Sequence, residues 1–521
     1  MTLFGKFLGV GGATSASRVL GFVREAMIAA VLGAGPVADA FYAALRFPNL
    51  FRRLFAEGAF NSAFVPIFAK EVEANGEESA AQFAGEVFSV LAVVLAALTA
   101  LALVFMPFLA ATVIAPAFQD TPDKFDLTVL LARIMFPYLA AMSLVAMLSG
   151  VLNSFRRYFL AALAPVLLNV ALIGVLLIAL NTGRDDRATG VALAIGVVVA
   201  GLLQLGLLIY GMVRLGFRFS PKRPRLTPQV KRLLRLAAPA ALTGGIVQIN
   251  LVIGQIIASQ QDGAIALLNY ADRIYQLPLG VIGIAIGVVL LPELARALGS
   301  GEQKTALTLQ NRSLEFGLGL TVPAAVALAL TPVPFIAVIY ERGAFLPETT
   351  QAAAAALAAF AIGLPSFVLI KVLQPAYFAR EDMKTPMWFS LVSLIVNAGG
   401  SLAMFPYFGH VGIAAATSLA GWANAALLGW TLWHRGHFRP SPDTLKRTLL
   451  VLVSAAAMGI VLLGAWTHLQ EMFLASNILV RAGIAGLLIV VSMIVYFGLA
   501  IATGGIDRAM LVRTLQRRKP G

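Results

Sequence analysis

Residues 87–114 read VFSVLAVVLAALTALALVFMPFLAATVI, and none of their side chains is charged. A helix of about 20 apolar residues is long enough to cross the hydrocarbon core of a bilayer. Inside that core only helices and closed barrels satisfy their backbone hydrogen bonds, and this stretch lacks the alternating pattern of a barrel strand. The stretch therefore predicts a membrane-spanning helix.

The composition extends this prediction to the whole chain. Of its 521 residues, 59% are hydrophobic and 12% are charged, and the mean hydropathy is +0.86. The charged share is about half that of a typical soluble domain. This composition excludes a disulfide-rich secreted domain, a disordered chain and a nucleic-acid-binding domain, despite the net charge of +14. Because the chain has no cysteine and four scattered histidines, we expect no metal site and no cofactor.

The apolar runs predict an all-α polytopic membrane protein with 14 transmembrane helices. The predicted spans are 3–32, 37–69, 82–114, 127–152, 158–180, 188–212, 230–259, 263–297, 305–331, 350–378, 386–405, 410–432, 447–468 and 479–504. Polar residues and prolines interrupt the second, eighth and tenth spans. These interruptions predict bent helices beside a cavity.

Basic residues fall mainly in alternate loops. With the N-terminus placed inside, 25 of the 39 Lys and Arg residues lie in inside segments and five lie in outside segments. Because cytoplasmic loops are enriched in Lys and Arg, this asymmetry predicts a multi-pass protein with both termini in the cytoplasm. The longest basic loop, residues 213–235, fixes the topology and is also a candidate for contacting anionic membrane lipids.

The two halves of the chain have features of a repeat. Similar local patterns recur at offsets of 226, 223 and 228 residues, and the matched pairs are Pro66 and Pro292, Phe155 and Phe378, and Asn169 and Asn397. Two copies of six spans have the same orientation, and a shared cavity between them is typical of transporters. The predicted domains are an N-lobe (1–215), a C-lobe with the basic loop (216–440), and two terminal helices with a basic tail (441–521).

Charged and polar residues inside the predicted spans are the candidate functional residues. They are Arg18, Arg24 and Glu25 in the first span, Asp39, Asn49, Arg52 and Arg53 in the second, Asn169 in the fifth, and Asp272, Arg273 and Gln276 in the eighth. An arginine facing lipid costs roughly 2.5–3.5 kcal/mol on insertion scales, so we expect Arg18, Arg24, Arg52 and Arg273 to face a wet cavity. Arg53 is more simply explained by an i,i+4 ion pair with Glu57. Several arginines with few acids indicate an anionic cargo such as a phosphate or diphosphate.

The opening of the chain resembles the MurJ (MviN) lipid II flippases of the multidrug/oligosaccharidyl-lipid/polysaccharide (MOP) exporter superfamily. The resemblance is carried by residues 17–69, SRVLGFVREAMIAAVLGAGPVADAFYAALRFPNLFRRLFAEGAFNSAFVPIFA. It continues through APVLLN (164–169), NYADRIYQLPLGVIGIAIGVVLLPEL (269–294) and KVLQPAYFAREDMKTP (371–386), and so covers essentially the whole chain.

This resemblance implies a transporter of the bacterial cytoplasmic membrane, not an enzyme. Such a flippase moves the undecaprenyl-diphosphate-linked disaccharide–pentapeptide, lipid II, from the inner to the outer leaflet by alternating access, in peptidoglycan and cell wall biogenesis that maintains cell shape. The implied diphosphate-binding residues are Arg18, Arg24, Arg52 and Arg273, with Asn49 and Asn169 as polar cavity residues. Glu25, Asp39, Arg53, Asp272 and Gln276 form the implied gating and charge network.

The chain departs from the family pattern at two places. One branch of the family has an acid where this chain has Gln276, so a charge-switching role is not expected there. A sodium site described for part of the family needs carboxylates on the seventh and eleventh helices, and the apolar stretches of those spans contain none. The resemblance also implies that residues 447–504 form an apolar groove for a polyprenyl tail.

Three alternatives remain open at this point. A related exporter would move another lipid-linked oligosaccharide or a drug. A polytopic glycosyltransferase would need acids in a sizeable outward loop, and the longest outward loops, 115–126 and 340–349, are short. A channel is disfavoured by the repeat. The expected partners are lipid II and membrane lipids and no nucleic acid; cell-wall synthesis proteins are further candidates, and we expect a monomer.

Overall fold

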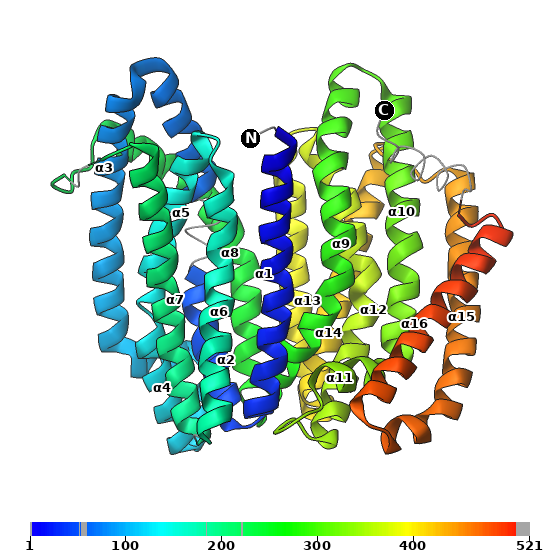
Figure 1. Ribbon diagram of the computed structural model, residues 1–521. Coiled ribbons are helices and arrows are strands. Elements are labelled where there is room, and N and C mark those ends of the chain that lie inside the picture. The colour runs from blue at the N-terminus through cyan, green and yellow to red at the C-terminus, as the bar shows by residue number, and fades with distance from the viewer. Residues whose placement is uncertain (1–2, 52, 54–59, 184, 220–221, 507–521) are drawn as a thin grey trace. The chain divides into compact units, whose positions relative to one another are not determined.

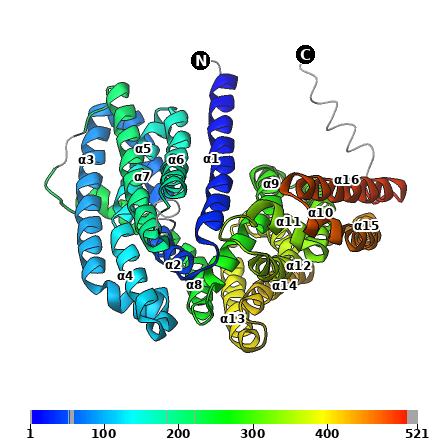
Figure 2. The same ribbon diagram turned by 60° about the horizontal axis from the view of Figure 1, so that its bottom comes forward.

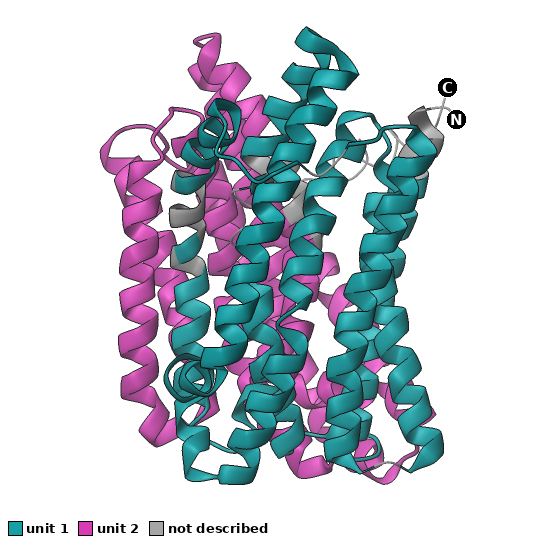
Figure 3. Ribbon diagram, turned by 90° about the vertical axis from the view of Figure 1, so that its left-hand side faces the viewer, with its two compact units in different colours: residues 1–266, 342–345 teal, residues 267–341, 346–521 magenta. Residues whose placement is uncertain are grey.

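The computed structural model describes residues 3–51, 53, 60–183, 185–219 and 222–506. Across these residues the chain is α-helical with short connections, and the described part contains no strand (Figure 1). The chain divides into two compact units, coloured separately in Figure 3. Unit 1 comprises residues 1–266 and 342–345, and unit 2 comprises residues 267–341 and 346–521.

Unit 1 contains the first eight helices. They are α1 (Leu3–Leu32), α2 (Pro36–Phe51), α3 (Asn61–Leu109), α4 (Pro122–Met135), α5 (Tyr138–Ser154), α6 (Tyr158–Thr182), α7 (Asp186–Leu215) and α8 (Pro228–Ala258). A π-helical turn, η2 (Ala110–Ile114), and a 3₁₀ turn, η3 (Pro116–Asp120), join α3 to α4. Within this unit α1 packs on α6, α6 on α7, and α5 on α7 and α3. The helix α8 packs on α3 and η2, and so clusters with unit 1.

Unit 2 contains the remaining helices. They are α9 (Ala264–Gly299, whose first three residues cluster with unit 1), α10 (Gln303–Leu330), α11 (Pro332–Tyr340), α12 (Pro347–Phe378), α13 (Lys384–Phe408), α14 (His410–His434), α15 (Pro442–Ala475) and α16 (Ile478–Ala502). The helix α12 packs between α10 and α14, and α14 packs on α13. The last two helices lie side by side, with α15 against α10 (Figure 2). A shared apolar core joins α9, α10, α12, α15 and α16.

In the described residues the predicted spans are helical, apart from a break within the fourth, and the all-helical fold class is confirmed. Among the residues that the structure describes, ten helical segments are long and apolar enough to cross a membrane. They correspond to the third to sixth and the ninth to fourteenth predicted spans. The first, second, seventh and eighth spans hold most of the candidate charged and polar residues and fall outside this set, so the total of 14 stays a prediction.

The second and third predicted spans both reach into α3, where two helical stretches are joined at Gly76, whose φ of 80° is left-handed. Residues 70–81 therefore contain the expected turn, although they are helical on either side of it. One local feature differs from the sequence expectation. The fourth span, 127–152, is two helices, because α4 ends at Met135 and α5 begins at Tyr138, next to Pro137.

Candidate functional site

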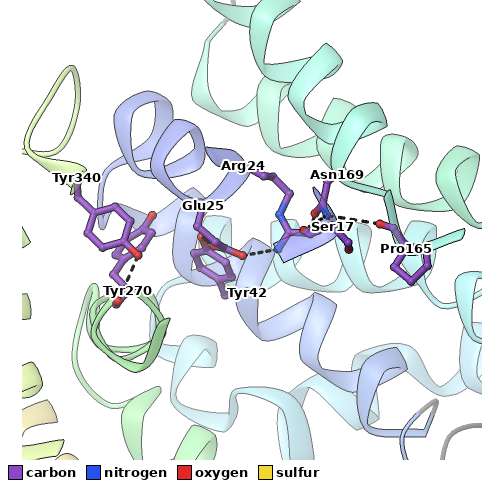
Figure 4. A network of polar contacts seen from close by, with 8 residues as sticks. All are labelled: Ser17, Arg24, Glu25, Tyr42, Pro165, Asn169, Tyr270 and Tyr340. Carbon is purple, nitrogen blue, oxygen red and sulfur yellow. Dashed lines mark hydrogen bonds and ion pairs between the residues drawn. The ribbon is translucent and has the colours of Figure 1, made fainter. Parts of the chain in front are cut away.

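The first polar cluster of unit 1 joins α1 to α6 (Figure 4). The guanidinium group of Arg24 donates a hydrogen bond of 3.0 Å from Nη1 to Oδ1 of Asn169. The amide of Asn169 in turn donates to the backbone oxygen of Ser17, at 2.9 Å, about two helical turns before Arg24. Between them Gly21 faces Asn169, because a β-carbon at Gly21 would lie 3.6 Å from the amide oxygen. One face of α1 is therefore fixed against one side chain of α6.

The second partner of Arg24 is its neighbour Glu25. Nη2 of Arg24 donates to Oε1 of Glu25 at 2.5 Å, and the hydroxyl of Tyr42 on α2 donates to Oε2 at 2.6 Å. Glu25 is 2% exposed, and a buried carboxylate is stable only when it is paired and hydrogen-bonded. This network ties α1, α2 and α6 around one buried ion pair (Figure 4).

One nitrogen of the Arg24 guanidinium group makes no hydrogen bond to the described residues. This nitrogen is Nε, and the side chain of Arg24 is only 10% exposed. An unsatisfied buried donor costs free energy, about 1–3 kcal/mol and more for a charged group. Arg24 is therefore held in place by Asn169 and Glu25 while it retains the capacity to bind another acceptor.

The second polar cluster of unit 1 surrounds Asp39, which is fully buried in the first turn of α2. Lys124, at the start of α4, donates to Asp39 at 2.9 Å and to Asp262 at 2.8 Å. The backbone N–H groups of Gly263 and Ala266 also donate to Asp39, at 2.7 and 3.0 Å. Since these two residues lie at the N-terminus of α9, Asp39 caps that helix from α2.

Lys124 lies in the predicted outward loop 115–126, and it is buried. Its side chain is only 2% exposed, and its ammonium group lies 4.0 Å from the centroid of the Phe118 ring. A buried charge needs a partner, and Lys124 has two carboxylates. It joins α4 to α2 and to the segment before α9 in one network.

Residues 342–345 pack on the end of α1 within unit 1. The N–H group of Ala344 donates to the backbone oxygen of Ala30 at 2.8 Å. A β-carbon at Gly343 would lie 2.2 Å from that same oxygen, and Gly343 has a φ of +59°. Only glycine accommodates both this close approach and this backbone conformation.

The candidate residues of unit 2 lie near the start of α9. Gln276 donates a hydrogen bond to Asp272 one turn earlier, and Arg273 between them is exposed. Tyr275 is buried against Phe360 and Phe367 of α12, with ring centroids 5.6 and 5.8 Å away. The buried Tyr275 fixes the rotation of α9, so Arg273 and Gln276 lie on its exposed side.

The other candidate residues are less closely connected. Arg18 is exposed, whereas Arg24 six residues later is buried. Asn49 is half-buried near the end of α2, and Arg53 is exposed. Arg52, and the Glu57 partner expected for Arg53, lie outside the described residues.

An apolar groove of about 390 Å³ lies in unit 2, lined by residues of α10, α12, α14 and α15. Its walls include Leu318, Ile362, Trp422 and Leu452. Ion pairs hold the terminal helices beside it, because Arg447 of α15 contacts Glu315 of α10 at 2.8 Å. At the start of α16, a second pair joins Arg481 to Glu341, at 2.6 Å.

Comparison with known proteins matches residues 28–483 to the family described as "Lipid II flippase MurJ". The chain belongs to this MurJ family. A probable lipid II flippase MurJ of Rhizobium tropici is 53% identical, covering 100% of this chain and 98% of the relative. The lipid II flippase MurJ of Burkholderia cenocepacia is 36% identical, covering 88% of each chain.

Solved structures agree with this assignment. A MurJ lipid II flippase in an inward closed conformation aligns with a TM-score of 0.75 and 25% identity, covering 94% of this chain and 99% of that chain. An inward-facing MATE family transporter of the MOP superfamily aligns with a TM-score of 0.66 and 16% identity, which shows a shared fold. The chain is thus a multi-pass membrane protein of the MurJ family.

Sequence reasoning missed three residues that organise the site in this MurJ family member. They are Tyr42, Lys124 and Gln255. The side-chain amide of Gln255 on α8 donates to the backbone oxygens of Ile114 and Ala43, at 2.7 and 3.3 Å. Lys124 and Gln255 contact elements 85 or more residues away in sequence, and Tyr42 contacts Glu25 on the preceding helix, so no pattern within one helix could have revealed them.

Proposed function

We propose that this chain is a lipid II flippase. It moves undecaprenyl-diphosphate-linked disaccharide–pentapeptide from the inner to the outer leaflet of the cytoplasmic membrane, and it works as a transporter without catalysing a chemical reaction. The observation that carries the proposal is the buried, half-satisfied guanidinium group of Arg24 in a chain of the MurJ family. A guanidinium group with a free donor suits the oxygens of a diphosphate.

The head group is bound, in this proposal, by Arg18, Arg24, Arg52 and Arg273. Two of them, Arg18 and Arg273, are exposed on their units and are therefore accessible to a ligand. Asn49 and Asn169 supply polar contacts, and Asn169 also positions Arg24. The diphosphate offsets the mutual repulsion of these arginines, which is unfavourable when they lie close together without an anion.

The polyprenyl tail stays in apolar surroundings during transport. The groove beside α15 has the required apolar lining, and ion pairs at both ends of the α15–α16 pair hold these helices in place. Because the surrounding lipid is itself apolar, an isoprenoid chain that enters the groove removes little surface from water, and its contacts there are van der Waals packing. The groove then holds the tail without restricting the head group.

Transport proceeds by alternating access, in which the two units change their relative position. Both termini are cytoplasmic, so a membrane potential that is negative inside helps to return the arginine-rich empty carrier. The help amounts to about 2.3 kcal/mol per charge per 100 mV. The protein acts as a monomer, and contacts with cell-wall synthesis proteins would deliver or remove its substrate.

Complementation tests this function in bacteria depleted of their own lipid II flippase. The wild-type chain and the control Arg187→Ala, an exposed arginine, should restore growth and normal lipid II levels. Arg24→Ala and Arg273→Ala, at equal abundance, should fail and should leave lipid II accumulated inside. If the wild-type chain leaves lipid II accumulated and changes only another surface polysaccharide, the cargo is a different lipid-linked oligosaccharide.

A further inference from the structure

A cationic cavity lies in unit 1, away from Arg24. It has a volume of about 620 Å³ and is formed by the start of α1, the turn between α5 and α6, and the end of α7. Three of its lining residues are arginines, Arg156, Arg157 and Arg214, and no described lining residue is acidic. None of these three guanidinium groups is paired with a carboxylate among the described residues. The cavity therefore carries uncompensated positive charge.

The backbone of the turn holds two of these arginines together. Arg156 has a left-handed φ of 58°, which costs a residue other than glycine free energy. The N–H groups of Arg156 and Arg157 donate to the oxygens of Asn153 and Leu152, both at 2.9 Å, and so fix this conformation. The left-handed conformation of Arg156 turns the chain so that Arg156 and Arg157 both line the cavity.

The start of α6 adds a further attraction for anions. Arg157 is the N-cap residue of this 25-residue helix, and no side chain caps its first N–H groups. The N-terminus of a helix carries partial positive charge and free donors, which suit a phosphate group. Here the uncapped terminus lies at the wall of the arginine-lined cavity, because Tyr158, Phe159 and Leu160 of its first turn are lining residues.

The aromatic residues around the cavity indicate a membrane interface. Tyr158, Phe159 and Tyr210 are 43%, 50% and 55% exposed, and they lie at the ends of two candidate membrane spans. Tyrosine at such positions is typical of the level of the lipid head groups. The guanidinium group of Arg214 lies 6.0 Å from the centroid of the Tyr210 ring. A phosphate reaching this cavity would thus approach from the bilayer surface.

We propose that this cavity binds the phosphodiester head group of an anionic phospholipid such as phosphatidylglycerol, with the acyl chains along the exposed faces of α6 and α7. The site is distinct from the arginines proposed for transport and does not depend on the transported substrate. Free inorganic phosphate has related chemistry, but it would gain nothing from the apolar and aromatic surroundings.

Lipid binding to the purified full-length protein tests the proposal. Short-chain phosphatidylglycerol is titrated into the protein in neutral detergent, and bound lipid is counted by native mass spectrometry. We expect the double variant Arg156→Gln/Arg157→Gln to bind at least about tenfold more weakly than wild type. The matched control is Arg296→Gln/Arg312→Gln, two exposed arginines outside both the cavity and the basic loop 213–235, which should bind like wild type.

Three further measurements make the test decisive. Phosphatidylcholine should bind weakly to every form, and millimolar inorganic phosphate should not displace phosphatidylglycerol. Gly9→Leu fills the cavity while keeping its charge, because a β-carbon at Gly9 already lies 3.3 Å from the Phe159 ring. This variant should also lose phosphatidylglycerol binding. If the arginine double variant fails to fold, the result for Gly9→Leu alone tests the proposal. Wild-type affinity in both cavity variants, or displacement by inorganic phosphate, would overturn the proposal.

Discussion

Arg24 of α1 and Asn169 of α6 are joined by a hydrogen bond of 3.0 Å between buried side chains 145 residues apart in sequence. Asn169 also holds the backbone of Ser17, so it fixes both the position of α1 and the direction of the guanidinium group. A proposed substrate-binding arginine is thus pre-organised by a residue that need not touch the substrate.

Replacing Asn169 should therefore impair transport through Arg24. Asn169→Leu leaves the guanidinium group without one partner, which costs roughly 1–3 kcal/mol. We expect at least a tenfold lower rate of lipid II flipping in proteoliposomes, with a lower melting temperature. Asn181→Leu is the control, because Asn181 is exposed near the end of the same helix. Equal rates for the two variants would show that Asn169 does not position Arg24.

Lys124 and Asp262 are the two other charged residues of the Asp39 cluster, and we expect their replacement to lower the stability of the protein by unequal amounts. Lys124→Met leaves Asp39 buried without its ion pair, which should destabilise the protein by about 3–5 kcal/mol. Asp262→Asn changes a side chain that is 88% exposed, so about 0–1 kcal/mol is expected. Thermal unfolding in detergent distinguishes the two. A similar loss in both variants would mean that Asp262, and not Asp39, is the essential partner of Lys124.

The contact between Gly343 and Ala30 predicts a steric effect. Gly343→Ala places a β-carbon 2.2 Å from a backbone oxygen, so residues 342–345 must leave α1. Gly183→Ala is a matched control, since Gly183 has the same φ of +59° and nothing within 4 Å. The control should lose only about 1 kcal/mol of backbone strain. Complementation should fail for Gly343→Ala and succeed for Gly183→Ala, and the reverse order would contradict the contact.

Asp382 lies between α12 and α13, outside the membrane-spanning segments, and we expect its carboxyl group to make the stability of the protein depend on pH. Burial raises the pKa of this carboxyl, but hydrogen bonds from Thr385 and Arg435 outweigh it and lower the pKa to about 2. Because the folded-state pKa lies below the ordinary value of 3.8, the stabilisation is complete above that value and is lost as pH falls toward 2. The melting temperature should fall less steeply between pH 4 and 2 in Asp382→Asn. An unchanged slope would contradict the ion pair with Arg435.

The sequence predicts the helices well because apolar length is a local property. The first predicted span, 3–32, has the same bounds as α1. The break at Pro137 within the fourth span depends on packing, so hydropathy alone did not indicate it.

The candidate site was only partly predictable from sequence. Arg24 and Glu25 stand out as adjacent charges in an apolar run, and the structure pairs them. Their partner Tyr42 is an ordinary residue of an apolar helix and gives no signal. Lys124 lies next to three acids in a short segment, which is the pattern of a solvated loop. Its burial follows from its contacts with Asp39 and Asp262, which lie 85 and 138 residues away in the sequence.

Lipid II binding to purified protein tests the central claim most directly. The dissociation constant is measured for wild type, Arg24→Ala, Arg273→Ala and the exposed-arginine control Arg187→Ala in the same detergent. The account predicts that the first two substitutions each weaken binding at least about tenfold, as expected for loss of a charge-assisted contact with the diphosphate, while the control is unchanged. Wild-type affinity in both folded variants would contradict the claim that these arginines hold the substrate.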